Sequence, residues 1–188
     1  GNSNNGVCRP LDLSSTSTSV GSEVTFSTDS PTYIKAIGCG IGDEDKILVF
    51  YKANTSGKLH YRVGSPSNSG TNTTISFGSE STSIQGGAST GSPLWVDAAW
   101  DDSNNKVIVT WTDATSYKGY IRCGTITPAS GTSITWDAVE SEYANKAYHA
   151  HVVYNSWDNR GVAVYRDTDN SNYGTGRPFN PNASLPAR

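Results

Sequence analysis

Residues 95–137 read WVDAAWDDSNNKVIVTWTDATSYKGYIRCGTITPASGTSITWD, and the fold predicted for the whole chain follows from this stretch. Short apolar runs alternate with clusters of Asp, Asn, Ser and Gly, a pattern typical of short strands joined by turns. Much of the stretch occurs again: KVIVTW at 106–111 corresponds to KILVFY at 46–51, 60 residues earlier, and to RGVAVY at 160–165, 54 residues later. Such spacing indicates an array of one supersecondary unit.

The composition favours strands over helices and argues against two classes of partner. Ser, Thr, Asn and Gly dominate the polar residues, and no window shows helical periodicity. The hydrophobic share of 35% is low for a globular domain, but five Trp and ten Tyr put much apolar area into few side chains. The formal net charge of −3 leaves no basic stripe for nucleic acid, and no apolar run is long enough for insertion into a membrane.

The cysteines and the chain start carry little functional signal. Cys8, Cys39 and Cys123 are an odd number without metal-ligand spacing, so we expect buried free thiols, with one disulfide and one free thiol as the alternative. The absence of Met at position 1 suggests a processing or expression boundary. Sequons of the form Asn-x-Ser/Thr, which matter in a secreted eukaryotic protein, are at Asn54, Asn72 and Asn182.

The repeat predicts how the chain is divided. VGSE at 20–23 aligns with FGSE at 77–80, which indicates that the chain starts inside a repeat. We expect a half-blade with third and fourth strands at 1–28, a full unit at 29–81, a second unit at 82–140, a half-blade with first and second strands at 141–175, and an extended tail at 176–188. The tail is predicted because its three prolines and lack of alternation do not suit a strand.

This division predicts an all-β fold, a β-propeller-like array of four-stranded antiparallel blades with about three units. The two chain ends would share one blade, because one end supplies third and fourth strands and the other supplies first and second strands. Propellers typically have about four to eight blades, so three units are too few for a ring. The chain is then part of a longer array, or two copies complete one ring as a homo-oligomer, or the units stack without a ring.

The repeat also resembles a known class of protein. The pattern is carried by residues 74–78, 101–113, 131–136 and 165–174, and it is similar to the propeller-like repeats of marine bacteriophage tail-fibre and other virion structural proteins. The resemblance covers roughly residues 18–175. It implies an extracellular or virion-surface role in structure or attachment, with a cell-surface glycan as a partner to consider. It brings no set of catalytic residues.

The first strands of the units hold the best candidate site. Aligning them by the basic residue that opens each second strand predicts two columns of side chains on one face: Ile37, Asp97 and His151 in one, and Lys35, Trp95 and His149 in the other. If the first strands are innermost in a propeller, these side chains converge on its axis. His149 and His151 would then reach one metal together with Asp97, or all three would be polar channel residues bonded to water and backbone.

The ends of the second strands suggest a second type of site. An aromatic residue followed by polar residues recurs as Trp111-Thr112-Asp113 and as Tyr165-Arg166-Asp167. A lectin with one sugar site per blade would show this pattern, with Trp95, Trp111, Asp113, Tyr165 and Arg166 as contacts. Rings packed between adjacent sheets would show it equally, and we interpret the rings as core.

The acidic residues do not indicate catalysis. They fall mostly in turns, where Asp accepts backbone hydrogen bonds, and no pair of carboxylates is placed for glycoside hydrolysis. The chain has no Gly-x-Ser-x-Gly elbow. We therefore expect a non-enzymatic module without a cofactor, a lectin as the alternative, and a glycan-active hydrolase as a third hypothesis. Calcium at the turns 43–46 or 101–105 is the remaining cofactor hypothesis, because oxygen-rich loops suit that ion.

Overall fold

The computed structural model describes residues 4–12, 19–41, 44–69, 72–81, 84–85, 89–126, 133–137 and 141–181. These residues form antiparallel strands and turns, which confirms the prediction of an all-β fold. Within the same ranges no helix is long and apolar enough to cross a membrane.

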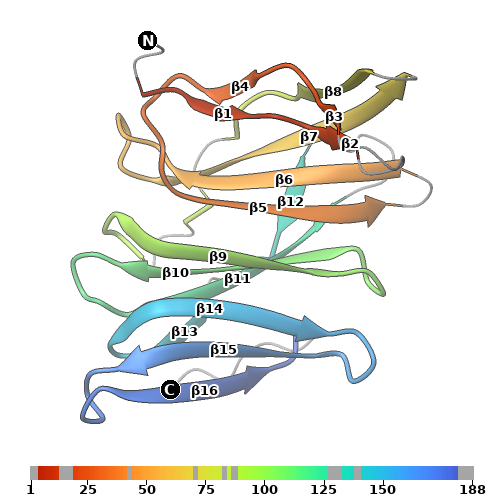
Figure 1. Ribbon diagram of the computed structural model, residues 1–188. Coiled ribbons are helices and arrows are strands. Elements are labelled where there is room, and N and C mark those ends of the chain that lie inside the picture. The colour runs from red at the N-terminus through yellow and green to blue at the C-terminus, as the bar shows by residue number, and fades with distance from the viewer. Residues whose placement is uncertain are drawn as a thin grey trace.

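Two complete sheets follow the chain in strand order (Figure 1). The first unit consists of β5 (Thr32–Ile41), β6 (Glu44–Lys52), β7 (Leu59–Ser69) and β8 (Asn72–Phe77). The second unit consists of β9 (Pro93–Asp101), β10 (Lys106–Asp113), β11 (Gly119–Ile126) and β12 (Ile134–Trp136), and β13 (Ser141–Ala144) also pairs with β11. Each sheet is therefore a meander whose neighbours in sequence are neighbours in space.

The last sheet corrects one prediction about the C-terminal segment. It contains β14 (Ala147–Asn155), β15 (Arg160–Asp167) and a third strand, β16 (Tyr173–Phe179), where we expected a tail from residue 176. The strand pairs with β15 from Tyr173 to Phe179 and includes Pro178. A proline is tolerated there because β16 is the edge strand of this sheet, so its missing N–H needs no partner on the open side.

The N-terminal residues form a single hairpin that is interrupted in the middle. It pairs β1 (Gly6–Cys8) with β4 (Val24–Ser27) and β2 (Leu11–Asp12) with β3 (Ser19–Val20). A backbone N–H just after a fourth-strand segment donates to the third strand at three equivalent places: Gly21 to Pro10 (2.8 Å), Gly78 to Val63 (2.9 Å) and Asp137 to Cys123 (2.9 Å). The recurrence supports the alignment of 20–23 with 77–80.

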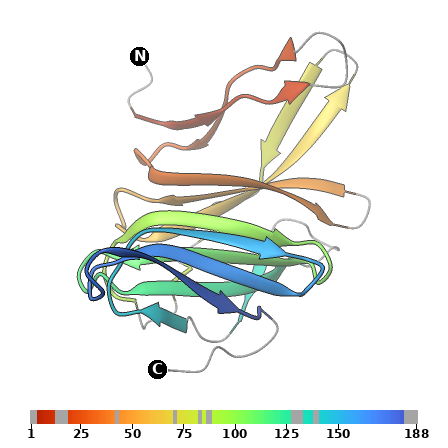
Figure 2. The ribbon, with the colours of Figure 1, turned by 60° about the horizontal axis from the view of Figure 1, so that its bottom comes forward.

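The sheets form a stack with the two termini at opposite ends (Figures 1 and 2). The N-terminal hairpin lies beyond the first unit, and β14–β16 lie beyond the second. The first strands β5, β9 and β14 lie side by side on one face of the stack. The described strands of the two end groups are in separate sheets, so a blade shared by the two ends of one chain is not formed here.

Aromatic side chains fill the joints between stacked sheets. The ring of Phe26 on β4 packs against Tyr51 with centroids 5.5 Å apart, and the ring of Tyr143 on β13 packs against Tyr165 at 5.3 Å. At the joint between the first two units, Trp111 is fully buried. Burying a large apolar side chain stabilises a fold by roughly 2–3 kcal/mol, so these rings are a main source of cohesion between sheets.

A buried carboxylate ties the second unit to the segment that precedes it. Asp113 accepts hydrogen bonds from Gly91 N (2.6 Å), Thr115 N (2.8 Å), Ser116 N (2.9 Å) and Ser89 Oγ (3.2 Å). A Cβ at Gly91 would come within 2.5 Å of Asp113 Oδ1, so the joint has room for one carboxylate only.

The first unit has an equivalent carboxylate link, but its carboxylate is on the segment before the first strand. Ala53 occupies the position of Asp113, and the carboxylate comes from Asp29 in the preceding segment. Asp29 accepts a hydrogen bond from Thr55 N at 2.9 Å. It lies two residues before Pro31, as Gly91 lies two residues before Pro93, so Asp29 and Gly91 are equivalent. The carboxylate therefore comes from the second strand in the second unit and from the segment before the first strand in the first unit, and in both it accepts a backbone N–H of the following turn, from Thr115 or Thr55.

Asp113→Ala is expected to lower the free energy of unfolding by about 2 kcal/mol, because buried N–H groups lose their acceptor. Gly91→Asp alone is also expected to destabilise, since two carboxylates would then compete for one space. The double variant Gly91→Asp/Asp113→Ala copies the first unit and should recover part of the loss. Urea unfolding measures all three, and additive losses in the double variant would contradict the exchange of carboxylates.

Candidate functional site

The register of the first strands differs from the prediction in the first unit. Asp97 pairs with Thr110 and His151 with Val164, but the equivalent residue Phe50 pairs with Lys35. The predicted column of Ile37, Asp97 and His151 therefore names the wrong residue in the first unit. The equivalent residue is Lys35, two positions before Ile37. The hairpin of β5 and β6 is two residues longer than the others, so Lys35 has the register position of Asp97 and His151, and Tyr33 has that of Trp95 and His149. Ile37 packs against the core instead.

Asp97 links the first strands of all three units. Its Oδ1 lies 2.6 Å from Lys35 Nζ on β5, and its Oδ2 accepts a hydrogen bond from Val152 N on β14 at 2.9 Å and lies 3.3 Å from His151 Nδ1. Burial raises the pKa of Asp97, but hydrogen bonds from Lys35, Val152 N and Ala98 N outweigh it, so the pKa lies below its ordinary value. The carboxylate is charged at neutral pH and almost fully buried.

A strained bulge occurs at the same place in each first strand. Tyr33, Trp95 and His149 have φ angles of 51°, 46° and 51°, in the left-handed region, and the strand register shifts at each of them. This region is uncommon for residues other than Gly, Asn and Asp, and it costs roughly 1–3 kcal/mol for a bulky side chain. Three neighbouring strands therefore carry a ring at the same strained position.

The bulge also separates His149 and His151, for which a shared metal was one of the two alternatives raised by the sequence. The ring of His149 packs against Trp95 with centroids 4.7 Å apart, whereas His151 contacts Asp97. Among the described residues, no three His, Cys, Asp or Glu side chains are grouped closely enough to hold a metal ion. The alternation of side chains that would have placed both histidines on one face is interrupted by the extra residue of the bulge.

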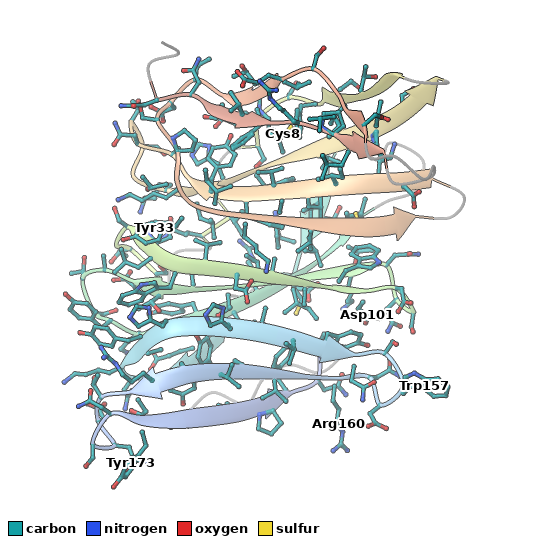
Figure 3. The ribbon with its side chains drawn as sticks, in the orientation of Figure 1. Cys8, Tyr33, Asp101, Trp157, Arg160 and Tyr173 are labelled. Carbon is teal, nitrogen blue, oxygen red and sulfur yellow. The ribbon has the colours of Figure 1, made fainter. Side chains whose placement is uncertain are left out.

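Four of these and neighbouring rings are in contact, and we call the group the aromatic ridge: Trp95, Tyr117, Tyr148 and His149, with Arg166 beside them and Tyr33 at the equivalent bulge of the first unit. Tyr148 lies between Trp95 (5.0 Å between centroids) and Tyr117 (5.0 Å, interplanar angle 9°). The guanidinium of Arg166 lies 5.0 Å from the ring centre of Tyr148. Tyr33 marks this edge in Figure 3, and Asp101, Trp157 and Arg160 lie at the opposite edge.

The other predicted contact residues are not accessible. Trp111 and Tyr165 are 0% and 5% exposed, so their rings belong to the core, as we interpreted them. Asp113 is 2% exposed and holds the joint described above. A sugar site built from Trp111, Asp113 and Tyr165 is therefore wrong, and of the second-strand residues only Arg166 remains in the candidate site. No sequence pattern indicates Tyr33 or Tyr117, because their place depends on register and on backbone conformation.

The turn acids and thiols have structural explanations. Asp101 accepts hydrogen bonds from Ser103 N and from the backbone and side chain of Asn104, which is the hairpin role expected of such residues. Asp43, from the other calcium hypothesis, lies outside the described residues. All three cysteines are free, and burial raises the pKa of Cys39 to about 11 and of Cys123 to about 12, which leaves both thiols protonated and unreactive.

Comparison with known proteins adds no assignment to this geometry. No family model matches the sequence, and no curated protein matches it significantly. The candidate site therefore consists of the aromatic ridge and the adjacent Asp97 link, as defined by the contacts of this chain.

The lowered pKa of Asp97 predicts a pH-dependent stability. Its contribution is present above the unfolded-state pKa of about 3.9 and is lost as the pH falls through the folded-state value. We expect the free energy of unfolding to decrease below about pH 4, and to decrease less steeply in Asp97→Asn, which cannot titrate. Asp102→Asn, in an exposed turn, is the control. Urea unfolding between pH 3 and 7 measures the slopes, and equal slopes for Asp97→Asn and the native chain would contradict the role of this carboxylate.

Proposed function

We propose that the chain is a non-enzymatic structural or attachment module on the outside of a virion or a cell. The observation that carries the proposal is the repetition of one strained, ring-bearing bulge in three neighbouring strands. Such strain is concentrated at functional sites, because a fold keeps it only where the conformation is useful. Repeated presentation of similar side chains on a rigid stack suits binding to a repetitive surface, where several weak contacts act together.

The finer architecture that we propose is a propeller-like array in which β5, β9 and β14 are the innermost strands. Their side-by-side placement supports this arrangement, as does the chain of contacts from Lys35 through Asp97 to His151. A second copy or further units of a longer chain would complete the array. Light scattering of the purified chain distinguishes the first case, in which the mass is a multiple of 20.0 kDa.

The attachment proposal predicts that the folded, fluorescently labelled chain is retained on at least one surface in a panel of bacterial and eukaryotic cells. The retention should depend on the aromatic ridge, so Trp95→Asn should reduce it at least tenfold, while Trp157→Asn at the opposite edge should leave it unchanged. Flow cytometry after washing measures the retention. Absence of retention on every surface, or equal retention of both variants, would contradict attachment through this edge.

One cluster in the first unit brings together the residue types of a hydrolytic triad, but His60 Nδ1 makes no hydrogen bond to the described residues. Ser56 Oγ lies 2.9 Å from His60 Nε2, and His60 Nδ1 lies 3.2 Å from Glu80 Oε1. Ser56 Oγ also accepts a hydrogen bond from Lys58 N at 3.2 Å, which closes the turn between β6 and β7. The carboxylate of Glu80 in turn accepts the hydroxyl of buried Tyr51 at 2.6 Å.

The second unit forms the same turn without a histidine. Ser116 Oγ accepts Lys118 N at 3.3 Å, and Tyr120 stands at the position of His60. The serine is therefore needed for the turn in both units, whether or not a base is beside it. This comparison supports a structural role for Ser56.

A fluorophosphonate probe, which modifies activated serines, is expected to leave Ser56 unlabelled. Ser56→Ala should lower the free energy of unfolding by about 1 kcal/mol, and Ser116→Ala by a similar amount, because each removes one turn hydrogen bond. Intact-mass spectrometry detects labelling, and urea unfolding gives the stabilities. Labelling of Ser56 that disappears in His60→Ala would overturn the proposal of a module without catalysis.

A further inference from the structure

We propose that the aromatic ridge binds a neutral oligosaccharide of pyranose units that extends across neighbouring units of the stack. The inference rests on the proposed attachment function and names its ligand class and its site. It keeps Trp95 and Arg166 from the sugar contacts predicted from the sequence, and it replaces the buried ones with residues on the first strands and in the turn after a second strand.

The choice of residues at the bulges is the first argument. A left-handed backbone position favours Gly, Asn or Asp, and His is tolerated better than most residues, whereas Tyr and Trp are unfavourable. The bulge itself would form more easily with Asn at positions 33 and 95. Rings are present at Tyr33 and Trp95 despite this cost, which indicates that the side chains are needed for contact with something outside the backbone.

The accessibility and rigidity of the ridge are the second argument. Tyr33 and Tyr117 are 39% and 38% exposed, and Trp95 and Tyr148 are half-buried. Contacts among the rings of Trp95, Tyr148 and Tyr117 hold the cluster in one arrangement before any ligand arrives. Rigid aromatic side chains lose little conformational entropy on binding, which makes them effective contact residues.

The polar groups at the ridge favour a neutral polyhydroxyl ligand. Ring faces contact the C–H faces of a pyranose, and the exposed Arg166 and His149 supply N–H donors for its hydroxyl oxygens. The nearest buried charge, Asp97, is already neutralised by Lys35, and the exposed Lys146 pairs with Asp169 at 3.3 Å. Within the ridge the ionised side chain is the guanidinium of Arg166, which lies against the ring of Tyr148 and can also donate to neutral hydroxyls.

The repetition of the ridge predicts the length of the ligand. The ring centroids of Trp95 and His149, on neighbouring units, are 4.7 Å apart, and ring contacts continue through Tyr148 to Tyr117, so one chain of sugars can contact several rings of two units. An oligosaccharide that contacts two units gains from the second contact at a high effective concentration, which a monosaccharide does not. Affinity should therefore rise with chain length.

Titration of the folded chain with glucose, cellohexaose, galactose, a β-linked galactohexaose and a single-stranded oligothymidine tests the inference. Calorimetry should show that at least one hexasaccharide binds ten times or more tightly than its own monosaccharide. Tyr33→Asn and Trp95→Asn should each weaken this binding at least tenfold without lowering the urea midpoint, because Asn suits the backbone at both positions. Trp157→Asn is the matched control, since Trp157 is 93% exposed at the opposite edge (Figure 3).

Four outcomes would overturn the sugar site: no binding of either hexasaccharide to natively folded chain, equal binding of monosaccharide and hexasaccharide, binding lost in Trp157→Asn but kept in Trp95→Asn, or tighter binding of the oligothymidine, whose bases also stack on rings.

Cells treated with periodate separate this inference from attachment itself. Retention that survives oxidation of the surface sugars overturns the sugar ligand and leaves attachment standing. Hexasaccharide binding without retention on any cell overturns attachment and leaves the sugar site standing.

Discussion

The carboxylate of Asp97 is the interaction on which the arrangement of the first strands depends. It receives the ammonium of Lys35 from the sheet before it and the backbone N–H of Val152 from the sheet after it. Loss of the carboxylate would leave the buried N–H of Val152 without an acceptor, which is costly, and would remove the partner of the partly exposed Lys35 ammonium. The rings at the bulges lie two residues from this link on each strand, so their relative placement follows from it.

At the joints between sheets, equivalent interactions recur from unit to unit although the residues that make them differ. The ring contact of Phe26 with Tyr51 is repeated by Tyr143 with Tyr165, while Trp111 at the middle joint donates its Nε1–H to Ser89 instead. The carboxylate at the joint is likewise supplied from either side. Because each sheet packs mainly on its neighbours, each joint can change independently as long as its space is filled and its donors are satisfied.

Sequence predicted the features that depend on local patterns and missed those that depend on register or backbone conformation. Strand segments, turns and the repeat are encoded in short stretches, so the all-β meanders were predictable. The column containing Asp97 was predicted with Ile37 in place of Lys35, because alignment on Lys46 could not reveal a longer hairpin. The conformation of Trp95 was not predictable, since nothing about a Trp indicates a left-handed backbone. The strand containing Pro178 was missed because the rule against proline does not hold at a sheet edge.

The candidate site lies where local sequence rules fail. The position of a core ring such as Trp111 can be predicted from the apolar pattern of its strand, because burial alone stabilises it there. A bulged ring such as Trp95 opposes its local backbone preference, so packing against Tyr148 and the link through Asp97 must hold it in place. A conformation that local preference opposes and tertiary contacts enforce is typical of a residue retained for its contacts outside the fold. The conflict between local preference and structure at the three bulges is therefore the most informative property of this chain about its function.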